Sequence, residues 1–249
     1  MRPWRRRQKQ PLRYYLYISD AKLDMLFSQI DESILKRISA EVRVDLKLAG
    51  VTLREREQPI VARTAKLRVV ERYITQYHSV GTITDPGPEY FRGHMNMQWG
   101  WLRGYRWDDQ NPPIVIFRGR EESDFVALAG SRRHVLGEQA GDTSRNAEAF
   151  SALPNILAVV GEHISGSPEI GQAVHDLREH PEPSEESTAI GDPPLYALNS
   201  FAVTHMPVPP EPLEFLAVRL TEGSMTESGF EGVHGVLGTP LYVARWRRP

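Results

Sequence analysis

The stretch HMNMQWGW, residues 94–101, decides how the middle of the chain folds. Its apolar side chains alternate with polar residues or glycine, and they are Met95, Met97, Trp99 and Trp101. Because successive side chains of a strand point to opposite faces, this period of two predicts a strand with one buried face. These four side chains are interpreted as core rather than as the lining of a ligand groove. Short apolar runs follow at residues 114–117 and 125–129, and an antiparallel meander is the simplest connection of three strands.

The residues before this meander predict one strand followed by helices. Residues 14–18, YYLYI, are typical of a strand, and Ser19 and Asp20 can accept hydrogen bonds from the free N–H groups of a following helix. Apolar residues recur at helical spacing in three segments, residues 21–30, about 34–38 and 63–78. The sequence DPGP at residues 85–88 predicts a turn that ends this half.

A strict alternation at residues 42–48 predicts a further strand with one charged face, because Arg43, Asp45 and Lys47 alternate with apolar residues. Asp45 and Lys47 also match half of a metal-dependent nuclease site, in which a carboxylate holds Mg²⁺ and a lysine helps to position or deprotonate water. Asp20 or Asp24 could supply a second carboxylate. A strand with one face in water accounts for the same pattern, and this interpretation is preferred.

The second half of the chain predicts two helices, an exposed loop and three strands. The helices span residues 146–160 and 170–180, and the loop, rich in Pro, Ser and Glu, spans 180–194. The strands span residues 195–203, 213–220 and 240–246. The whole pattern predicts a single α+β domain over residues 14–246, with helices packed on a mostly antiparallel sheet. Residues 1–13 are basic and are predicted to form a flexible tail.

Composition excludes several classes of protein and site. The 30 basic and 32 acidic residues give a net charge of −2, so nucleic acid is expected to bind only through the basic termini, if at all. The absence of cysteine excludes disulfides and thiolate sites. No apolar run is long enough for a membrane helix or a signal peptide, which predicts a cytoplasmic protein. The histidines match no ligand spacing, and no phosphate-binding glycine motif occurs, so no metal or cofactor is predicted.

Five segments carry a resemblance to a known family. They are YYLYISDAKLDML (14–26), EVRVDLKL (41–48), GSRRHVLG (130–137), LEFLAVRL (213–220) and LGTPLYVARW (237–246). With these segments, residues 13–246 resemble an uncharacterised family, a domain of unknown function found largely in actinobacteria. The resemblance implies one continuous domain and an actinobacterial setting, and it transfers no catalytic residue. It also suggests a sensor or adaptor in bacterial signalling or defence, by association alone.

The segment LAGSRRHVLGE, residues 128–138, is the main candidate for a functional site. A turn at Gly130 and Ser131 would offer backbone N–H groups and a hydroxyl, with basic side chains nearby, and could hold a phosphate or carboxylate. Sheet proteins often place ligands at strand ends, and polar residues also follow the strand at 14–18. The candidate contacts are Asp20, Lys22, Ser131, Arg132, Arg133 and His134.

Three other interpretations of the same residues stay open. Ser131 and His134 could form the nucleophile and base of a hydrolase, although residues three apart on a strand face opposite sides and the motif GxSxG is absent. A surface hairpin whose glycines only ease the turn is the preferred structural interpretation of the segment. An interaction protein would use a sheet edge or a terminal arm. The leading hypothesis is a cytoplasmic binding module for a small anionic ligand or a partner protein, and whether it is an enzyme is left open.

Overall fold

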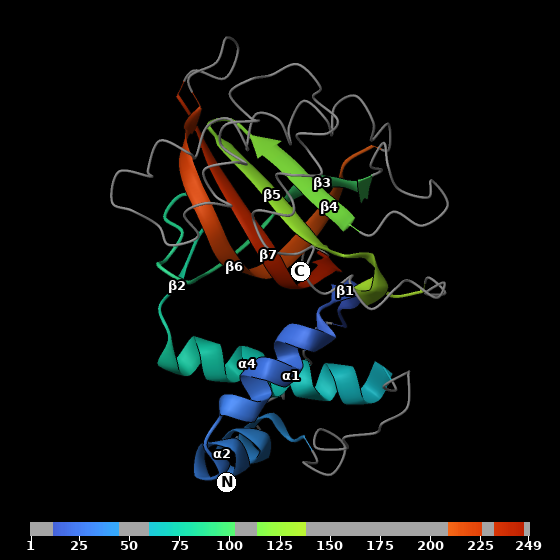
Figure 1. Cartoon of the computed structure of the whole chain (residues 1–249), viewed down its shortest axis with the longest axis vertical. Helices are drawn as coiled ribbons and strands as arrows, with labels where there is room; N and C mark the ends of the chain where they lie inside the picture. The colour runs from blue at the N-terminus through green and yellow to red at the C-terminus, as the bar shows by residue number, and fades with distance from the viewer. Residues whose placement is uncertain (1–11, 45–59, 103–113, 138–208, 226–231, 247–249) are drawn as a thin grey trace, which may run out of the picture.

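The structure is a computed structural model that describes residues 12–44, 60–102, 114–137, 209–225 and 232–246. Figure 1 shows a curled sheet with three helices gathered at one side of it. The helices are α1 (Asp20–Gln29), α2 (Glu32–Val42) and α4 (Ile60–Tyr77). The strands are β1 (Tyr14–Ile18), β2 (Val80–Gly81), β3 (Tyr90–Leu102), β4 (Ile114–Glu121), β5 (Asp124–Ser131), β6 (Glu211–Met225) and β7 (Val233–Arg245). This is the predicted α+β arrangement with a mostly antiparallel sheet.

Five strands close into a barrel because β7 pairs with both β6 and β5, which are the two ends of the run β6–β3–β4–β5. One edge of β7 pairs antiparallel with β6 over the whole length of β7. The first half of its other edge pairs in parallel with β5, from Asp124↔His234 to Leu128↔Gly238. The antiparallel pairs β5–β4, β4–β3 and β3–β6 complete the ring. The antiparallel meander of β3, β4 and β5 was predicted, whereas the closure and the parallel pair were not.

Strands β1 and β2 extend this sheet beyond the barrel. β1 has the predicted bounds and pairs antiparallel with the second half of β7, from Tyr14↔Arg245 to Ile18↔Tyr242. β2 is a two-residue strand that lies parallel to the start of β3. Arg13, which the sequence placed in the basic tail, precedes β1 and forms ion pairs with Glu71 and Glu214.

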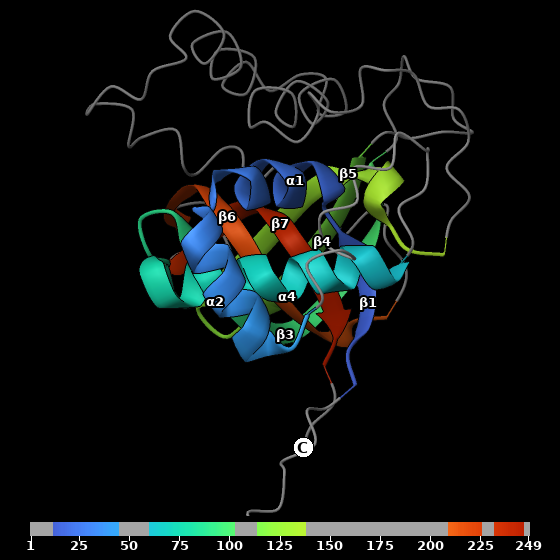
Figure 2. The same ribbon diagram turned by 90° about the horizontal axis from the view of Figure 1, so that it is seen from below.

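Apolar side chains form two cores, one on each face of the sheet. The barrel interior is filled from alternate positions of its strands, among them Met95, Met97, Phe117, Leu128 and Phe215. The second core lies between the helices and the outer face of the sheet, and includes Leu23, Ile38, Leu67, Ile74 and Leu241. Figure 2 shows the three helices lying over the strands, with α4 contacting both α1 and α2. The core interpretation of the methionines is therefore confirmed, while the side chain of Trp101 lies outside the described residues.

The predicted strand at residues 42–48 is wrong at its start. α2 continues through Val42, and Arg43 adopts a left-handed conformation with φ 56° that ends the helix. Val42 stands four residues after Ile38, so it continues the apolar stripe of the helix and packs against the helix–sheet core. The apolar residues of α2 continue at helical spacing as far as Val42, so Val42 is helical although an alternating pattern begins there.

Several predicted segments lie outside the described residues. They are the helices at 146–160 and 170–180, the loop at 180–194, the strand at 195–203 and residues 45–48 of the strand just discussed. Among the residues that the structure does describe, no helix is long and apolar enough to cross a membrane.

The contact between Gly130 and Tyr17 yields a test of the barrel packing. A Cβ atom at Gly130 would lie 2.5 Å from the Tyr17 hydroxyl oxygen and 2.7 Å from Cζ. We expect Gly130→Ala to lower the free energy of unfolding by about 1–3 kcal/mol, measured by urea denaturation, because overpacking forces neighbouring groups apart. In a Tyr17→Leu background the same substitution should cost much less. An equal cost in both backgrounds would contradict this account.

Candidate functional site

Polar residues that follow β1 and β5 meet at one end of the barrel. β5 ends at Ser131 and leads into a 3₁₀ turn over Arg132–His134. The turn docks onto β1, because Leu136 N–H donates to the Leu16 carbonyl oxygen at 2.8 Å. The side chains gathered here, named the His134 cluster, are Tyr17, Ser19, Asp20, Lys22, Arg63, Ser131, Arg133 and His134. Of the sequence-predicted contacts, Asp20, Lys22, Ser131, Arg133 and His134 are thus brought together, whereas Arg132 stands at the start of the turn.

The preferred interpretation of this segment as a surface hairpin is therefore wrong. Ser131 and His134 are only 3% and 5% exposed. Arg132 begins the 3₁₀ turn, and its carbonyl oxygen accepts a hydrogen bond from the N–H of Val135 at 2.9 Å. Val135 is buried and belongs to the barrel core, which holds the turn against β1.

Asp20 joins the cluster to helix α4. Its Oδ2 atom lies 2.7 Å from a terminal nitrogen of Arg63 and 3.7 Å from Nδ1 of His134. Sequence reasoning missed Arg63, which lies on a helix distant in the chain and stands in no motif. Only the packing of α4 beside α1 brings its guanidinium to the start of α1.

His134 is held as a neutral ring whose proton position is defined by its neighbours. Burial lowers the pKa of His134, and Asp20 only partly opposes this effect. Arg133 Nε donates to His134 Nε2 at 3.3 Å, so the lone pair lies on Nε2 and the proton on Nδ1. Nδ1 is buried, and no described residue hydrogen-bonds to it, since Asp20 is beyond hydrogen-bonding distance.

Two buried hydroxyls beside His134 also lack hydrogen-bond partners within the described part of the chain. They are Ser131 Oγ and Tyr17 Oη. Tyr17 packs its ring edge-on to that of His134, with centroids 5.9 Å apart. Burial raises the pKa of Tyr17, so its hydroxyl keeps its proton at neutral pH. Buried polar groups are nearly always hydrogen-bonded in folded proteins, either within the chain or to a bound molecule.

Lys22 contributes a positive charge without a carboxylate partner. Its Nζ atom lies 3.5 Å from Ser19 Oγ, and among the described residues no carboxylate is within ion-pair distance. Burial lowers the pKa of Lys22 to about 8. The lysine is therefore still mostly charged at neutral pH, but at an energetic cost from lost hydration.

The geometry does not assemble the predicted serine hydrolase. Ser131 Oγ does not hydrogen-bond to His134, and the lone pair of Nε2 already accepts from Arg133. A serine nucleophile needs a base within hydrogen-bonding reach. The nuclease residues Asp45 and Lys47 lie outside the described residues, and Asp24 is paired with Lys66. Within the described ranges, no group of three or more metal-ligating side chains occurs.

A family comparison accounts for nearly the whole chain. The model of DUF7019, a family of unknown function, matches residues 13–246. The chain belongs to this family. Neither the comparison with curated proteins nor that with solved structures finds a match. Membership in DUF7019 agrees with the resemblance to a domain of unknown function, and the role of this DUF7019 chain has to be argued from its own residues.

The desolvated lysine of this DUF7019 protein yields a prediction with a defined pH dependence. We expect Lys22→Met to raise the free energy of unfolding at about pH 7 by roughly 1–3 kcal/mol, because it removes a poorly hydrated charge. In the wild type the pKa of Lys22 is about 8 when folded and 10.5 ordinarily, so between these values the unfolded chain binds more protons. Wild-type stability therefore rises with pH in this window, and the advantage of Lys22→Met shrinks.

Urea denaturation of both proteins at about pH 7 and about pH 9.5 checks this prediction. Lys36→Met is the control, since Lys36 is exposed and paired with Glu32 on α2, and it should give no such gain. A stability difference that is the same at both pH values would contradict the assignment.

Proposed function

We propose that this protein is a binding module for a small anion, a phosphate or carboxylate, held at the His134 cluster. One observation carries the proposal, namely that Tyr17 Oη, Ser131 Oγ and His134 Nδ1 are all buried and have no hydrogen-bond partner among the residues that the structure describes. All three can donate a hydrogen bond, and anions accept several at once. Hydrogen bonds to a charged ligand contribute more than neutral ones, so an anion would offset the cost of burying these groups.

The charge of the cluster supports an anion rather than a cation. Lys22, Arg63 and Arg133 bring positive charge, and Asp20 is the single carboxylate of the cluster. Because Asp20 already pairs with Arg63, a bound anion would form an ion pair with Lys22, which has no carboxylate partner among the described residues. A ligand at Lys22 would also explain why the chain keeps a charge where burial disfavours it.

Binding is proposed in preference to hydrolysis because Ser131 and His134 are not hydrogen-bonded to each other.

A partner protein is the other class of ligand expected from the sequence. The exposed large apolar side chains that would contact a partner protein lie on several segments of the described chain. They are Leu12, Tyr14, Met25, Ile60, Val61 and Tyr77. We further propose a cytoplasmic location in an actinobacterium and a sensor or adaptor role in signalling or defence, for which the anion would be the signal.

Isothermal titration calorimetry with sodium phosphate, sulfate and succinate, at constant ionic strength in chloride, tests the proposal. We expect saturable binding of at least one of these anions with a stoichiometry of one. Lys22→Gln should weaken it about tenfold or more, because a charge-assisted hydrogen bond contributes roughly 1.5–3 kcal/mol. Affinity should also fall as the pH rises above about 8, where Lys22 loses its charge.

A matched variant separates specific binding from general charge attraction. Lys36→Gln removes the same charge from an exposed position on α2. It should leave the affinity unchanged, whereas equal losses in Lys22→Gln and Lys36→Gln would contradict a site at the His134 cluster. An absence of heat with all three anions would overturn the proposal and favour the partner-protein class.

A further inference from the structure

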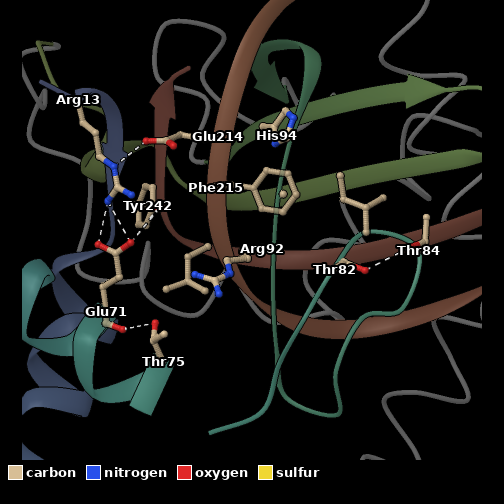
Figure 3. A pocket seen from close by; sticks show the side chains of 13 residues that line it. Arg13, Glu71, Thr75, Thr82, Thr84, Arg92, His94, Glu214, Phe215 and Tyr242 are labelled. Atoms are coloured by element: carbon tan, nitrogen blue, oxygen red, sulfur yellow. Dashed lines mark hydrogen bonds and ion pairs between the residues drawn. The ribbon is translucent and has the colours of Figure 1, made fainter. Parts of the chain in front are cut away.

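A groove at the opposite end of β1 from the His134 cluster forms a second candidate site. Its cavity of about 510 Å³ is bounded by α4, by the segment between β2 and β3, and by the outer face of β3 and β6. Figure 3 shows its polar side chains, with Arg92 between Glu71 on one side and Thr82 on the other. A volume of this size falls within the range of about 300–1,000 Å³ that is typical of small-molecule sites.

One end of the groove has more negative than positive charge. Arg13 bridges two carboxylates, with NH1 lying 2.8 Å from Glu71 Oε2 and Nε 2.8 Å from Glu214 Oε1. Tyr242 donates a further hydrogen bond to Glu71 Oε1 at 3.3 Å. Two carboxylates thus share a single guanidinium. Burial raises the pKa of Glu214, which Arg13 only partly opposes, so an additional cation here would stabilise its charged form.

The other end of the groove carries an uncompensated positive charge. Arg92 is exposed on β3, and among the described residues no carboxylate lies within ion-pair distance of it. The register Arg92↔Leu216 and His94↔Glu214 puts Arg92 diagonally across from Glu214 on the same face. Diagonal neighbours have Cα atoms about 7–8 Å apart. The opposite charges are therefore close, yet they do not pair directly.

Apolar and hydroxyl groups occupy the space around these charges. Leu216 stands opposite Arg92, and Ile83 inserts beside Gly93, where a Cβ atom would meet Ile83 Cδ1 at 2.5 Å. The hydroxyls of Thr82 and Thr84 lie 3.2 Å apart on the wall beyond Arg92 (Figure 3). The groove thus combines an acidic end, a basic end and an apolar floor.

We propose that this groove binds a zwitterion of the α-amino acid type, as a free amino acid or a short peptide. The ligand ammonium lies at Glu214, which shares the Arg13 guanidinium with Glu71, and the ligand carboxylate lies at Arg92. An apolar ligand side chain packs on Leu216 and Ile83. A guanidinium is well suited to a carboxylate because two parallel N–H groups can donate to its two oxygens.

Calorimetric titration of the full chain with leucine, Gly-Leu and Leu-Gly tests this proposal. We expect saturable binding of leucine or of a dipeptide. Tighter binding of leucine would identify a free amino acid as the ligand, and tighter binding of a dipeptide would identify a short peptide. N-acetyl-leucine lacks the ammonium and leucinamide lacks the carboxylate, so each should bind at least tenfold more weakly. Arg92→Gln, at an exposed position that leaves the fold intact, should weaken leucine or dipeptide binding at least tenfold.

Cross-controls make this site distinguishable from the His134 cluster. Lys22→Gln should leave amino acid binding unchanged, and Arg92→Gln should leave phosphate binding unchanged. The proposal is overturned if leucine and both dipeptides fail to bind, if N-acetyl-leucine binds as tightly as leucine, or if Arg92→Gln has no effect. A loss with Lys22→Gln equal to that with Arg92→Gln would also overturn it, since the ligand would then depend on both ends of β1.

Discussion

The pairing of β7 on both of its edges is the constraint on which the rest of the structure depends. β6 occupies one edge of β7 entirely, while β5 and then β1 share the other. This arrangement closes the barrel and leaves only a short stretch of one edge of β7 without a strand partner, where a long unpaired edge would invite aggregation. It also sets β5 and β1 along the same side of β7, so that the end of β5 at Ser131 meets the end of β1 near Tyr17.

Helix α4 is tied to both ends of β1 by ion pairs, and each tie belongs to a different candidate site. Arg63 meets Asp20 after β1, and Glu71 meets Arg13 before it. Partly buried pairs of this kind contribute little net stability, because desolvation offsets most of the attraction. Their main effect here is geometric, since they fix the helix relative to the strand that connects the His134 cluster to the groove.

Both proposed sites hold charge in a state that folding alone would not favour. Lys22 is charged where burial lowers its pKa, and Glu214 shares one guanidinium with Glu71 where burial raises its pKa. Local violations of good packing and pairing are expected at functional sites and are tolerated when the remaining structure is stable. The apolar cores on both faces of the sheet provide that stability.

Local sequence patterns alone determined β1, α1, α4 and the β3–β5 meander. Periodic spacing predicted α1, α4 and β3, because it reports which side chains share a face, and short apolar runs predicted β1, β4 and β5. The expectation that ligands bind at strand ends likewise grouped Asp20 with His134. Tertiary structure alone decided the closure of the barrel, since β5 and β7 pair across about a hundred residues and pairing leaves no local pattern. It also decided that α2 extends through Val42, and that Arg63 and Arg92 lie at the two candidate sites. Those side chains acquire their neighbours only when helix α4 docks and β6 joins β3, contacts that no local sequence spacing encodes.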